Sequence, residues 1–375
     1  MTETSASART TPWFARPAAR AWTCASAPAD VRDFHASLPG YAPTPLTELP
    51  SLAAELGVGR VFVKDESARL GLPAFKVLGT SWAVHRLLAD RPAGQRVEFV
   101  TATDGNHGRA VAREARRLGH GAHVFVSQGV HPGAAAAIER EGARVTRVAG
   151  DYDRAVREAA AAAGAAAHAV LVQDTAWPGY EEVPALIVEG YATLFAEVDE
   201  QLAAAGAGAP GLVVVPVGVG SLAQAAVTHY RGRPTPGTAP GTGPGTAPGT
   251  GPALLAVEPT AAAPALASLT HGEPVTVPTR TTAMAGLNCG TLSSLAWPYL
   301  RDGLDAATAV PDTAAATAQR DLTALGVPSG PCGAAPLAAA RAALTDAGRR
   351  AALAVTPTTT VVLLSTEGRG ANPHG

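Results

Sequence analysis

One lysine in this sequence stands where an amine could do covalent chemistry. Lys76 lies in "LPAFKVLG", with apolar residues on both sides, which indicates a buried side chain near the start of a helix. Burial disfavours an ammonium ion, so we expect a lowered pKa and free amine near neutral pH. A free amine can attack a carbonyl to form a Schiff base, whereas a guanidinium cannot. We interpret Lys76 as a Schiff-base lysine; an exposed lysine beside a local apolar cluster is the alternative.

The only other lysine is twelve positions away. The chain has 29 basic residues, and all except Lys64 and Lys76 are arginine. Lys64 follows the apolar run "RVFV" and precedes two acids in "KDES". We expect it to end a strand and to form a local salt bridge or strand-end contact, which is a structural role.

A glycine turn further along the chain is suited to holding a phosphate. "VVVPVGVGSLAQAAV" (213–227) predicts a strand, a turn and a helix. The amides of Gly218, Val219 and Gly220, the hydroxyl of Ser221 and a helix N-terminus together attract an anion. The segment has neither the GxGxxG of a dinucleotide site nor the GK[ST] of a nucleotide-binding loop. The phosphate of a smaller cofactor fits better than a nucleotide.

A second turn carries polar side chains. "TATDGNHGRAVA" (101–112) again predicts a strand end, a glycine-containing turn and a helix start. Open α/β sheets bind ligands at the carboxyl ends of their strands, so Asp104 and Asn106 should face a ligand there. Asp104 could accept a proton, and Asn106 could donate a hydrogen bond to an oxygen. We interpret His107 as a structural residue.

The elements that must position these residues alternate along the chain. Unbroken apolar runs predict strands that are buried on both faces, and alanine-rich segments between them predict crossover helices. The pattern is typical of an α/β protein with largely parallel, doubly wound sheets. The predicted strands are 60–64, 96–103, 122–127, 143–149, 169–174, 211–218, 253–259 and 359–366, and the predicted helices are 77–90, 106–118, 132–141, 151–163, 180–204, 220–230 and 333–348.

Composition narrows the class of partner. The chain has 375 residues, 47% of them apolar and 16% charged, with a net charge of −2. These values describe a globular protein and favour a small-molecule partner over nucleic acid or a membrane surface. The sequence has no continuous run of 18 apolar residues, so it predicts no membrane span. Three scattered cysteines without metal-ligand spacing predict no metal site, reduced thiols and a cytoplasmic location.

A repeat interrupts the second half of the chain. Residues 237–252 spell "GTAPGTGPGTAPGTGP", and this density of glycine and proline can neither nucleate a helix nor fill a core. We expect a flexible surface insert at 233–252 that carries no chemistry.

The segments described above resemble the pyridoxal 5′-phosphate enzymes of fold type II, the family of tryptophan synthase β and threonine dehydratase. The resemblance runs from about residue 40 to 368, and within the family it is closer to the diaminopropionate ammonia-lyases. It implies two lobes, each a mostly parallel twisted sheet flanked by helices, and a homodimer. The large lobe would hold 1–80 and 205–375, and the small lobe 81–204. The segments that carry the resemblance are "KDESARLGLPAFKVLG", "TATDGNHGRAVA", "VQDTAWPGYEEVPALIVEGYATL", "PVGVGSLAQAAVTHY", "TTAMAGLNCGTLSSLAWPYL" and "LLSTEG".

The resemblance also implies roles for the site residues. Lys76 would form the Schiff base with the cofactor, Asn106 would contact its phenolic oxygen, and the 218–221 turn would hold its phosphate. Ser365 or Thr366 would share a hydrogen bond with the pyridine nitrogen. A neutral hydroxyl there leaves the ring nitrogen largely unprotonated, which suits β-elimination.

Two acids complete the expected site. Lys76, Asp104 or Asp174 would remove the Cα proton, and one of the two aspartates could instead hold a second ammonium group of the substrate. The resemblance thus implies α,β-elimination of ammonia from 2,3-diaminopropionate, giving pyruvate and ammonia. The alternatives are a dehydratase, lyase or β-replacement enzyme for another β-substituted amino acid, and a non-catalytic binding protein on the same fold.

Overall fold

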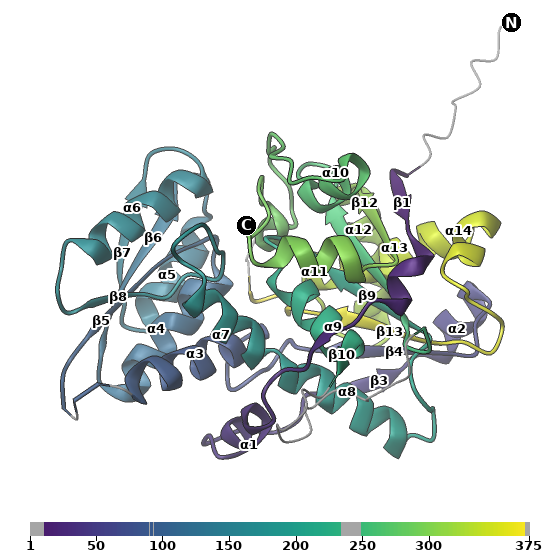
Figure 1. The fold of residues 1–375 in the computed structure, drawn as a ribbon, viewed down its shortest axis with the longest axis horizontal. Coiled ribbons are helices and arrows are strands. Elements are labelled where there is room, and N and C mark those ends of the chain that lie inside the picture. Colours follow the sequence, from purple (N-terminus) through teal and green to yellow (C-terminus); the bar gives the residue numbers. More distant parts are fainter. Residues whose placement is uncertain (1–10, 90, 93, 234–248, 372–375) are drawn as a thin grey trace, which may run out of the picture.

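A computed structural model of the chain describes residues 11–89, 91–92, 94–233 and 249–371. In Figure 1 a smaller sheet lies on the left and a larger one on the right, each with helices packed against it. A short parallel pair, β2 (Cys24–Ala25) with β10 (Gly232–Arg233), stands apart from both sheets. Most of the predicted insert at 233–252 lies outside the described residues.

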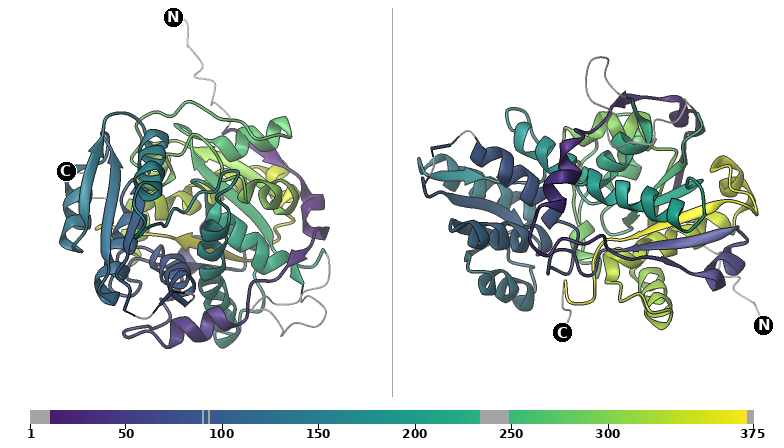
Figure 2. Two further views of the ribbon diagram at one scale, coloured as in Figure 1. Left: turned by 60° about the vertical axis from the view of Figure 1, so that its left-hand side comes forward. Right: turned by 90° about the horizontal axis from the view of Figure 1, so that it is seen from below.

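The larger sheet has seven strands in the order β1-β12-β11-β9-β13-β4-β3. The five inner strands run parallel, and the edge strands β1 and β3 are antiparallel to their neighbours. Helices cover both faces, as the turned views of Figure 2 show, which is why the central strands β9, β11 and β12 are mostly apolar. The bounds are β1 Trp13–Ala15, β3 Leu46–Glu48, β4 Arg60–Asp65, β9 Leu212–Pro216, β11 Ala253–Pro259, β12 Ala306–Val310 and β13 Thr360–Ser365.

The smaller sheet has four parallel strands in the order β7-β6-β5-β8. Its strands are β5 Glu98–Thr103, β6 Gly121–Ser127, β7 Arg144–Val148 and β8 Ala169–Leu171.

The helices divide between the two sheets. Helices α4 and α6 pack on the smaller sheet, while α13 packs on the inner strands of the larger one. The bounds are α1 Asp30–Ala36, α2 Pro50–Leu56, α3 Val77–Ala89, α4 Asn106–Leu118, α5 Pro132–Arg140, α6 Tyr152–Gly164, α7 Glu182–Gly190, α8 Ala192–Ala204, α9 Ser221–Arg231, α10 Pro264–His271, α11 Ala296–Gly303, α12 Asp312–Ala324, α13 Pro331–Leu344 and α14 Ala347–Ala352, with short 3₁₀ turns at Pro17–Ala21 and Ala285–Leu287.

The predicted α/β class with mostly parallel sheets is confirmed, but one predicted helix is divided. The expected helix 180–204 is α7 followed by α8, with the break at Tyr191. Gly190 lies so close to α3 that a Cβ atom on it would come within 2.6 Å of the Leu78 carbonyl oxygen. The chain therefore passes α3 at a point of direct backbone contact and then continues as a second helix.

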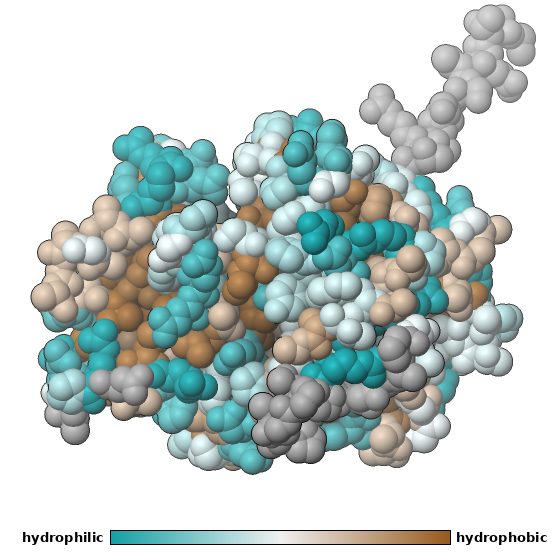
Figure 3. Space-filling model, in the orientation of Figure 1, coloured by the Kyte–Doolittle hydropathy of each residue, from teal (hydrophilic) through white to brown (hydrophobic). Residues whose placement is uncertain are grey.

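One apolar cluster of the core spans both sheets. It includes Phe99 and Val111 of the smaller lobe together with Val213 and Leu254 of the larger one. Figure 3 shows apolar residues gathered over the left-hand lobe and at its junction with the larger lobe. Helix α8 packs on α1, α9 and β3, which supports a lobe boundary near residue 191 rather than the expected 204. That division into lobes stays a proposal.

Within the described residues, we find no helix with the length and apolar character that a membrane crossing requires.

Candidate active site

The carboxyl ends of strands from both sheets meet around one cavity of about 740 Å³, a volume that includes its open mouth. The strand register explains the convergence in the smaller lobe. Val100 lies opposite Leu171, so Thr103 and Asp174, each three residues further on, leave the sheet at the same edge. The position expected for a ligand in an open α/β sheet is thus where the cavity lies.

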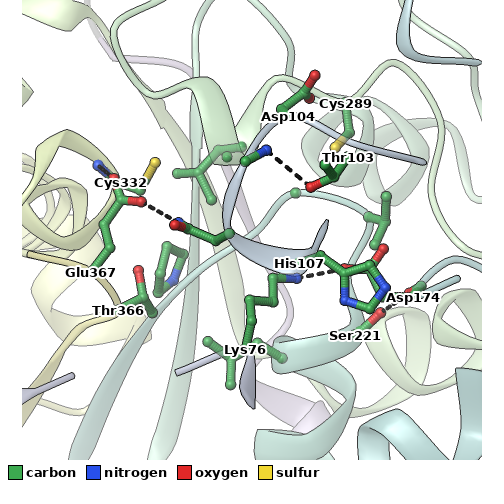
Figure 4. A pocket seen from close by; sticks show the side chains of 18 of the residues that line it. Lys76, Thr103, Asp104, His107, Asp174, Ser221, Cys289, Cys332, Thr366 and Glu367 are labelled. Carbon is green, nitrogen blue, oxygen red and sulfur yellow. Dashed lines mark hydrogen bonds and ion pairs between the residues drawn. The ribbon is translucent and has the colours of Figure 1, made fainter. Parts of the chain in front are cut away.

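Lys76 enters the cavity from the residue before α3. Its backbone carbonyl accepts a hydrogen bond from the amide of Thr80, which makes Lys76 part of the first helical turn. Its Nζ lies 2.6 Å from Oδ2 of Asp174 and 5.2 Å from the centroid of the Phe75 ring. Figure 4 shows Lys76 pointing toward Asp174 across the floor of the site.

The expected lowering of the Lys76 pKa is wrong. Burial does lower the pKa, but the negative charge of Asp174 outweighs burial and raises it above its usual value. Buried Asp174 responds in the opposite direction. Burial alone would raise the pKa of Asp174, whereas His107 and Lys76 lower it to about 2. In this arrangement the amine is protonated and the carboxylate ionised. Lys76 must therefore separate from Asp174 before its amine can act as a nucleophile.

His107 lies next to this pair. Its Nε2 is 2.8 Å from the Val172 carbonyl oxygen, and its Nδ1 is 3.9 Å from the Asp174 carboxylate. Burial lowers the pKa of His107, so the ring is neutral at neutral pH. The contacts agree with the structural role that we expected.

Asp104 lies in the turn between β5 and α4, and it behaves differently from Asp174. It lines the cavity, half-buried, without a cationic partner at hydrogen-bond distance in the described chain. Burial, followed by the negative charges of Asp174 and Asp153, raises its pKa to about 7. Two carboxyl groups whose environments push their pKa values apart can divide acid and base roles between them.

The glycine turn after β9 has the shape expected of a phosphate cradle. Gly220 has φ +101°, a conformation that favours glycine, and it directly precedes α9. A Cβ atom on Gly218 would lie 3.0 Å from the Gly286 carbonyl oxygen and 3.3 Å from the Cys289 sulfur, so only a bare backbone fits. Ser221 donates from its hydroxyl to the Asp174 carbonyl oxygen at 2.7 Å. These features fit a phosphate group held by backbone amides at a helix N-terminus.

The second turn is held in shape by one hydroxyl. Thr103 Oγ1 accepts hydrogen bonds from the amides of Gly105 and Gly108, at 2.9 and 3.0 Å. Gly105 has φ +149°, and a Cβ atom on Gly108 would come within 2.4 Å of the Thr103 side chain. The turn therefore needs its glycines to bring Asn106 to the cavity wall.

The structure places the two hydroxyls after β13 differently. Thr366 lines the cavity, whereas Ser365 is fully buried and donates from its hydroxyl to Ser329 Oγ at 2.9 Å. The cavity wall therefore favours Thr366 over Ser365 for a direct contact with a ligand, and this assignment stays a proposal.

Several cavity residues were missed by sequence reasoning. Glu367 and Tyr152 line the cavity beside the expected residues. Glu367 stands inside the quoted "LLSTEG", but nothing in that motif indicates its direction; Tyr152 begins α6 with no motif of its own. Cys289 and Cys332 also line the wall, and burial raises their pKa values well above the usual range. Neutral buried thiols are typical of small core residues and not of nucleophiles.

The other lysine belongs to a buried ion network instead of a local pair. Lys64 Nζ donates to Glu197 at 2.6 Å, to the Thr44 carbonyl oxygen at 2.8 Å and to Gln201 Oε1 at 2.8 Å. Arg69 pairs with the same Glu197 carboxylate at 2.6 Å, and all three ionic side chains are fully buried. The structural role of Lys64 stands, but its partner is 133 positions away and not one of the adjacent acids.

A lysine amine, a phosphate cradle and an amide-bearing turn around one cavity define an enzyme that uses pyridoxal phosphate. Residues 37–366 match the family described as "Pyridoxal-phosphate dependent enzyme", and the chain belongs to this family. It is similar to the diaminopropionate ammonia-lyase of Salmonella typhimurium, with 37% identity over 313 residues, 78% of this chain and 74% of the relative. The Escherichia coli K12 enzyme is 35% identical over 307 residues, 78% of this chain and 73% of the relative.

Solved structures of related enzymes are also similar to this chain. The E. coli diaminopropionate ammonia-lyase in complex with an aminoacrylate-PLP azomethine reaction intermediate matches with a TM-score of 0.80 and 32% identity, over 95% of this chain and 90% of that chain. Maize serine racemase matches in fold, with a TM-score of 0.69 and 24% identity over 92% and 94% of the two chains. The fold type II assignment and the pyridoxal 5′-phosphate cofactor are thereby confirmed.

Proposed function

We propose that this chain catalyses α,β-elimination of ammonia from 2,3-diaminopropionate, giving pyruvate and ammonia. The observation that carries the proposal is a pair of carboxylates, Asp104 and Asp174, in the cavity that holds Lys76. A substrate with two amino groups brings a second cation, and a carboxylate is its natural partner. The similarity to two diaminopropionate ammonia-lyases over most of the chain supports the same substrate.

Each residue has a distinct task in this proposal. Lys76 provides the amine that attaches the cofactor, and the 218–221 turn holds the phosphate. The bound cofactor supplies an electron sink that acidifies the Cα–H bond of the attached amino acid. Asp174, ionised at neutral pH, holds an ammonium group, as it holds that of Lys76.

Proton transfer at Cα needs a group that changes charge near neutral pH. With a pKa of about 7, Asp104 can both accept and return a proton. Lys76 is the other candidate once the substrate has replaced it, because its amine then remains in the cavity beside Asp174. After the β-amino group leaves as ammonia, free aminoacrylate hydrolyses in water to pyruvate and a second ammonia.

A panel of substrates tests the proposal. We expect pyruvate release from 2,3-diaminopropionate at least about 100-fold faster than from serine, threonine or O-acetylserine. Only the diamino acid brings a second ammonium group that can pair with a carboxylate of the cavity. A higher rate with serine or threonine would establish a dehydratase instead. A yellow, cofactor-loaded protein that releases no keto acid from the panel would establish a binding protein.

The Lys76→Ala variant tests the site independently of the substrate. We expect it to lose the borohydride-reducible visible absorbance that marks a covalently held cofactor. Retention of that absorbance at the wild-type level would show that another residue holds the cofactor.

Two further expectations belong to the proposal. A homodimer is expected from the family resemblance, and sedimentation velocity of the purified protein would check it. A cytoplasmic location is supported by the three cysteines, Cys24, Cys289 and Cys332, which are all free thiols.

A further inference from the structure

Glu367 is a cavity residue to which the proposed mechanism gives no task. It follows Thr366 at the carboxyl end of β13 and is 1% exposed. Figure 4 places Glu367 beside Thr366 and Cys332, on the side of the cavity away from Lys76 and Asp174. A carboxylate buried this deeply beside a ligand site must be held by specific donors.

Donors hold both of its oxygens, and the Cys332 thiol also hydrogen-bonds to the carboxylate. Asn106 donates from Nδ2 to Oε2 at 2.6 Å, and the backbone amide of Cys332 donates to Oε1 at 3.2 Å. Cys332 is the second residue of α13, so the carboxylate also lies at the positive end of a fourteen-residue helix. The backbone closes in behind it, because a Cβ atom on Gly330 would come within 3.0 Å of Oε1. Glu367 is therefore fixed in direction.

This fixed carboxylate decides how the Asn106 amide is turned. Oε2 accepts from Asn106 Nδ2 and Oε1 accepts from the Cys332 amide, so Glu367 faces the amide nitrogen of Asn106 and not the amide oxygen. The amide nitrogen carries two N–H groups, and the bond to Glu367 uses one of them. The second N–H remains for an acceptor on a ligand. If the amide were free to rotate by 180°, its oxygen could face that acceptor and repel it.

We propose that Glu367 is a positioning residue that holds Asn106 with an N–H group directed at the phenolic oxygen of the bound cofactor. Glu367 acts through Asn106, and the 2.6 Å bond between them transmits the effect. The inference rests on the cofactor and not on the identity of the amino-acid substrate. It can therefore be tested without any substrate.

The Glu367→Gln variant isolates this role. A glutamine side chain has one acceptor oxygen, whereas donors point at both oxygens of Glu367: Asn106 Nδ2 at Oε2 and the Cys332 amide at Oε1. Glutamine can satisfy only one of them, so the Asn106 amide loses its fixed direction. We expect a fall of about 10-fold in cofactor affinity, measured by quenching of intrinsic fluorescence on titrating the apo-protein with pyridoxal phosphate. A shift in the visible absorbance band of the bound cofactor should accompany it.

Glu258→Gln is the matched control. Glu258 is also a fully buried glutamate at a strand end before a helix, and it accepts from the amides of Ala265 and Leu266 at 2.8 Å each. It does not line the cavity. The same chemical change there should leave both the affinity and the absorbance band of the cofactor unchanged, even if the melting temperature falls.

A double-mutant cycle with Asn106→Ala decides between positioning and a separate contact. If Glu367 acts through Asn106, Glu367→Gln changes cofactor affinity by less than about 2-fold in the Asn106→Ala background. An equal 10-fold fall in both backgrounds overturns the proposal, as does a wild-type affinity and absorbance band in Glu367→Gln alone.

Asn106→Asp provides the same test if Glu367→Gln does not fold. It places a second carboxyl group against Glu367, and the two can share a proton only at low pH. We expect its cofactor affinity, relative to the wild type, to fall by about 10-fold between pH 5.5 and 8. A ratio that does not change with pH overturns the proposal.

Discussion

Asp174 and Lys76 form an ion pair inside the cavity, with Oδ2 of the carboxylate 2.6 Å from Nζ of the amine. Ninety-eight residues separate them, and they come from different parts of the fold: Asp174 follows a strand of the smaller sheet, and Lys76 precedes α3. The pair keeps the amine protonated when no cofactor is attached. It also places a negative charge where an ammonium group of the substrate would arrive.

Replacing Asp174 by asparagine should change when Lys76 can react. Loss of the carboxylate leaves burial as the main effect on the amine, so its pKa falls. We expect the pH midpoint for the rate of cofactor attachment to the apo-protein to move down by about one unit or more. The turnover rate should fall by about 100-fold or more. Stopped-flow absorbance at a series of pH values measures the midpoint.

Asp153→Asn is the control for that experiment. Asp153 is a half-buried carboxyl group on α6 that does not line the cavity. Its removal should leave the midpoint of cofactor attachment within about 0.3 units of the wild type. An unchanged midpoint in Asp174→Asn would mean that the ion pair does not control the amine.

Asp104 should make the protein less stable as the pH rises. Its pKa is raised from an ordinary value of 3.8 to about 7, so the folded state binds the proton more tightly than the unfolded state. The cost of ionising it develops between about pH 4 and pH 7. Between pH 4 and pH 8, the wild type should therefore lose stability that the Asp104→Asn variant keeps. We expect the free energy of unfolding of the wild type to fall over this range by about 2–3 kcal/mol relative to that of the variant. Urea denaturation at both pH values checks this, and a pH-independent difference would contradict it.

The Lys64 network should be sensitive to both charge and shape. Burial raises the pKa of Glu197, but Arg69 and Lys64 outweigh it and lower the pKa to about 2. Glu197→Gln leaves two buried cations with too little negative charge and should cost about 3–5 kcal/mol at pH 7. The wild-type contribution of Glu197 is present above pH 4.5 and is lost as the pH falls toward 2, so the difference should shrink with acidification.

Lys64→Arg keeps the charge and tests the shape. Three acceptors surround the single Nζ atom, and the larger planar guanidinium cannot replace it without overpacking. We expect a loss of about 1–3 kcal/mol in the free energy of unfolding, measured by chemical denaturation. Stability equal to the wild type would show that the site tolerates a guanidinium and that lysine is not required there.

A methyl group on Gly218 should obstruct the phosphate cradle. The added Cβ would lie 3.0 Å from the Gly286 carbonyl oxygen, so the turn must move. We expect Gly218→Ala to weaken cofactor binding by about 10-fold or more, since the amides lose their alignment toward the phosphate. Gly164→Ala is the control, because Gly164 ends α6 and a Cβ atom there meets nothing within 4 Å. Equal affinities in the two variants would argue against the cradle.

The sequence predicted the parts of the fold whose signal is local. Buried strands such as β9, "LVVVP", are continuous runs of β-branched residues, and the turns after β5 and β9 carry their glycines in sequence. Strand β12, "AATAV", was missed because its alanines have no strong preference for a strand. The turns after β5 and β9 were predicted as ligand sites because open α/β sheets bind ligands at the carboxyl ends of their strands, whereas Asp174 and Thr366 were added by the family resemblance.

Contacts between distant residues could not be predicted in the same way. Asn106 and Glu367 are 261 positions apart, and their bond depends on how the two sheets face each other. The pKa of Lys76 was predicted in the wrong direction for the same reason. Its apolar sequence neighbours indicated burial, but the carboxylate that reverses the effect lies 98 positions further along the chain.

Both side-chain amines of this protein are enclosed. Lys64 is completely buried, and the Lys76 side chain is 19% exposed within the cavity. Reagents that acylate lysine therefore meet arginine over the outer surface, and arginine does not react with them. In the folded protein, Lys76 is the one lysine that such a reagent can reach, so the extent of side-chain acylation measures the occupancy of the cavity.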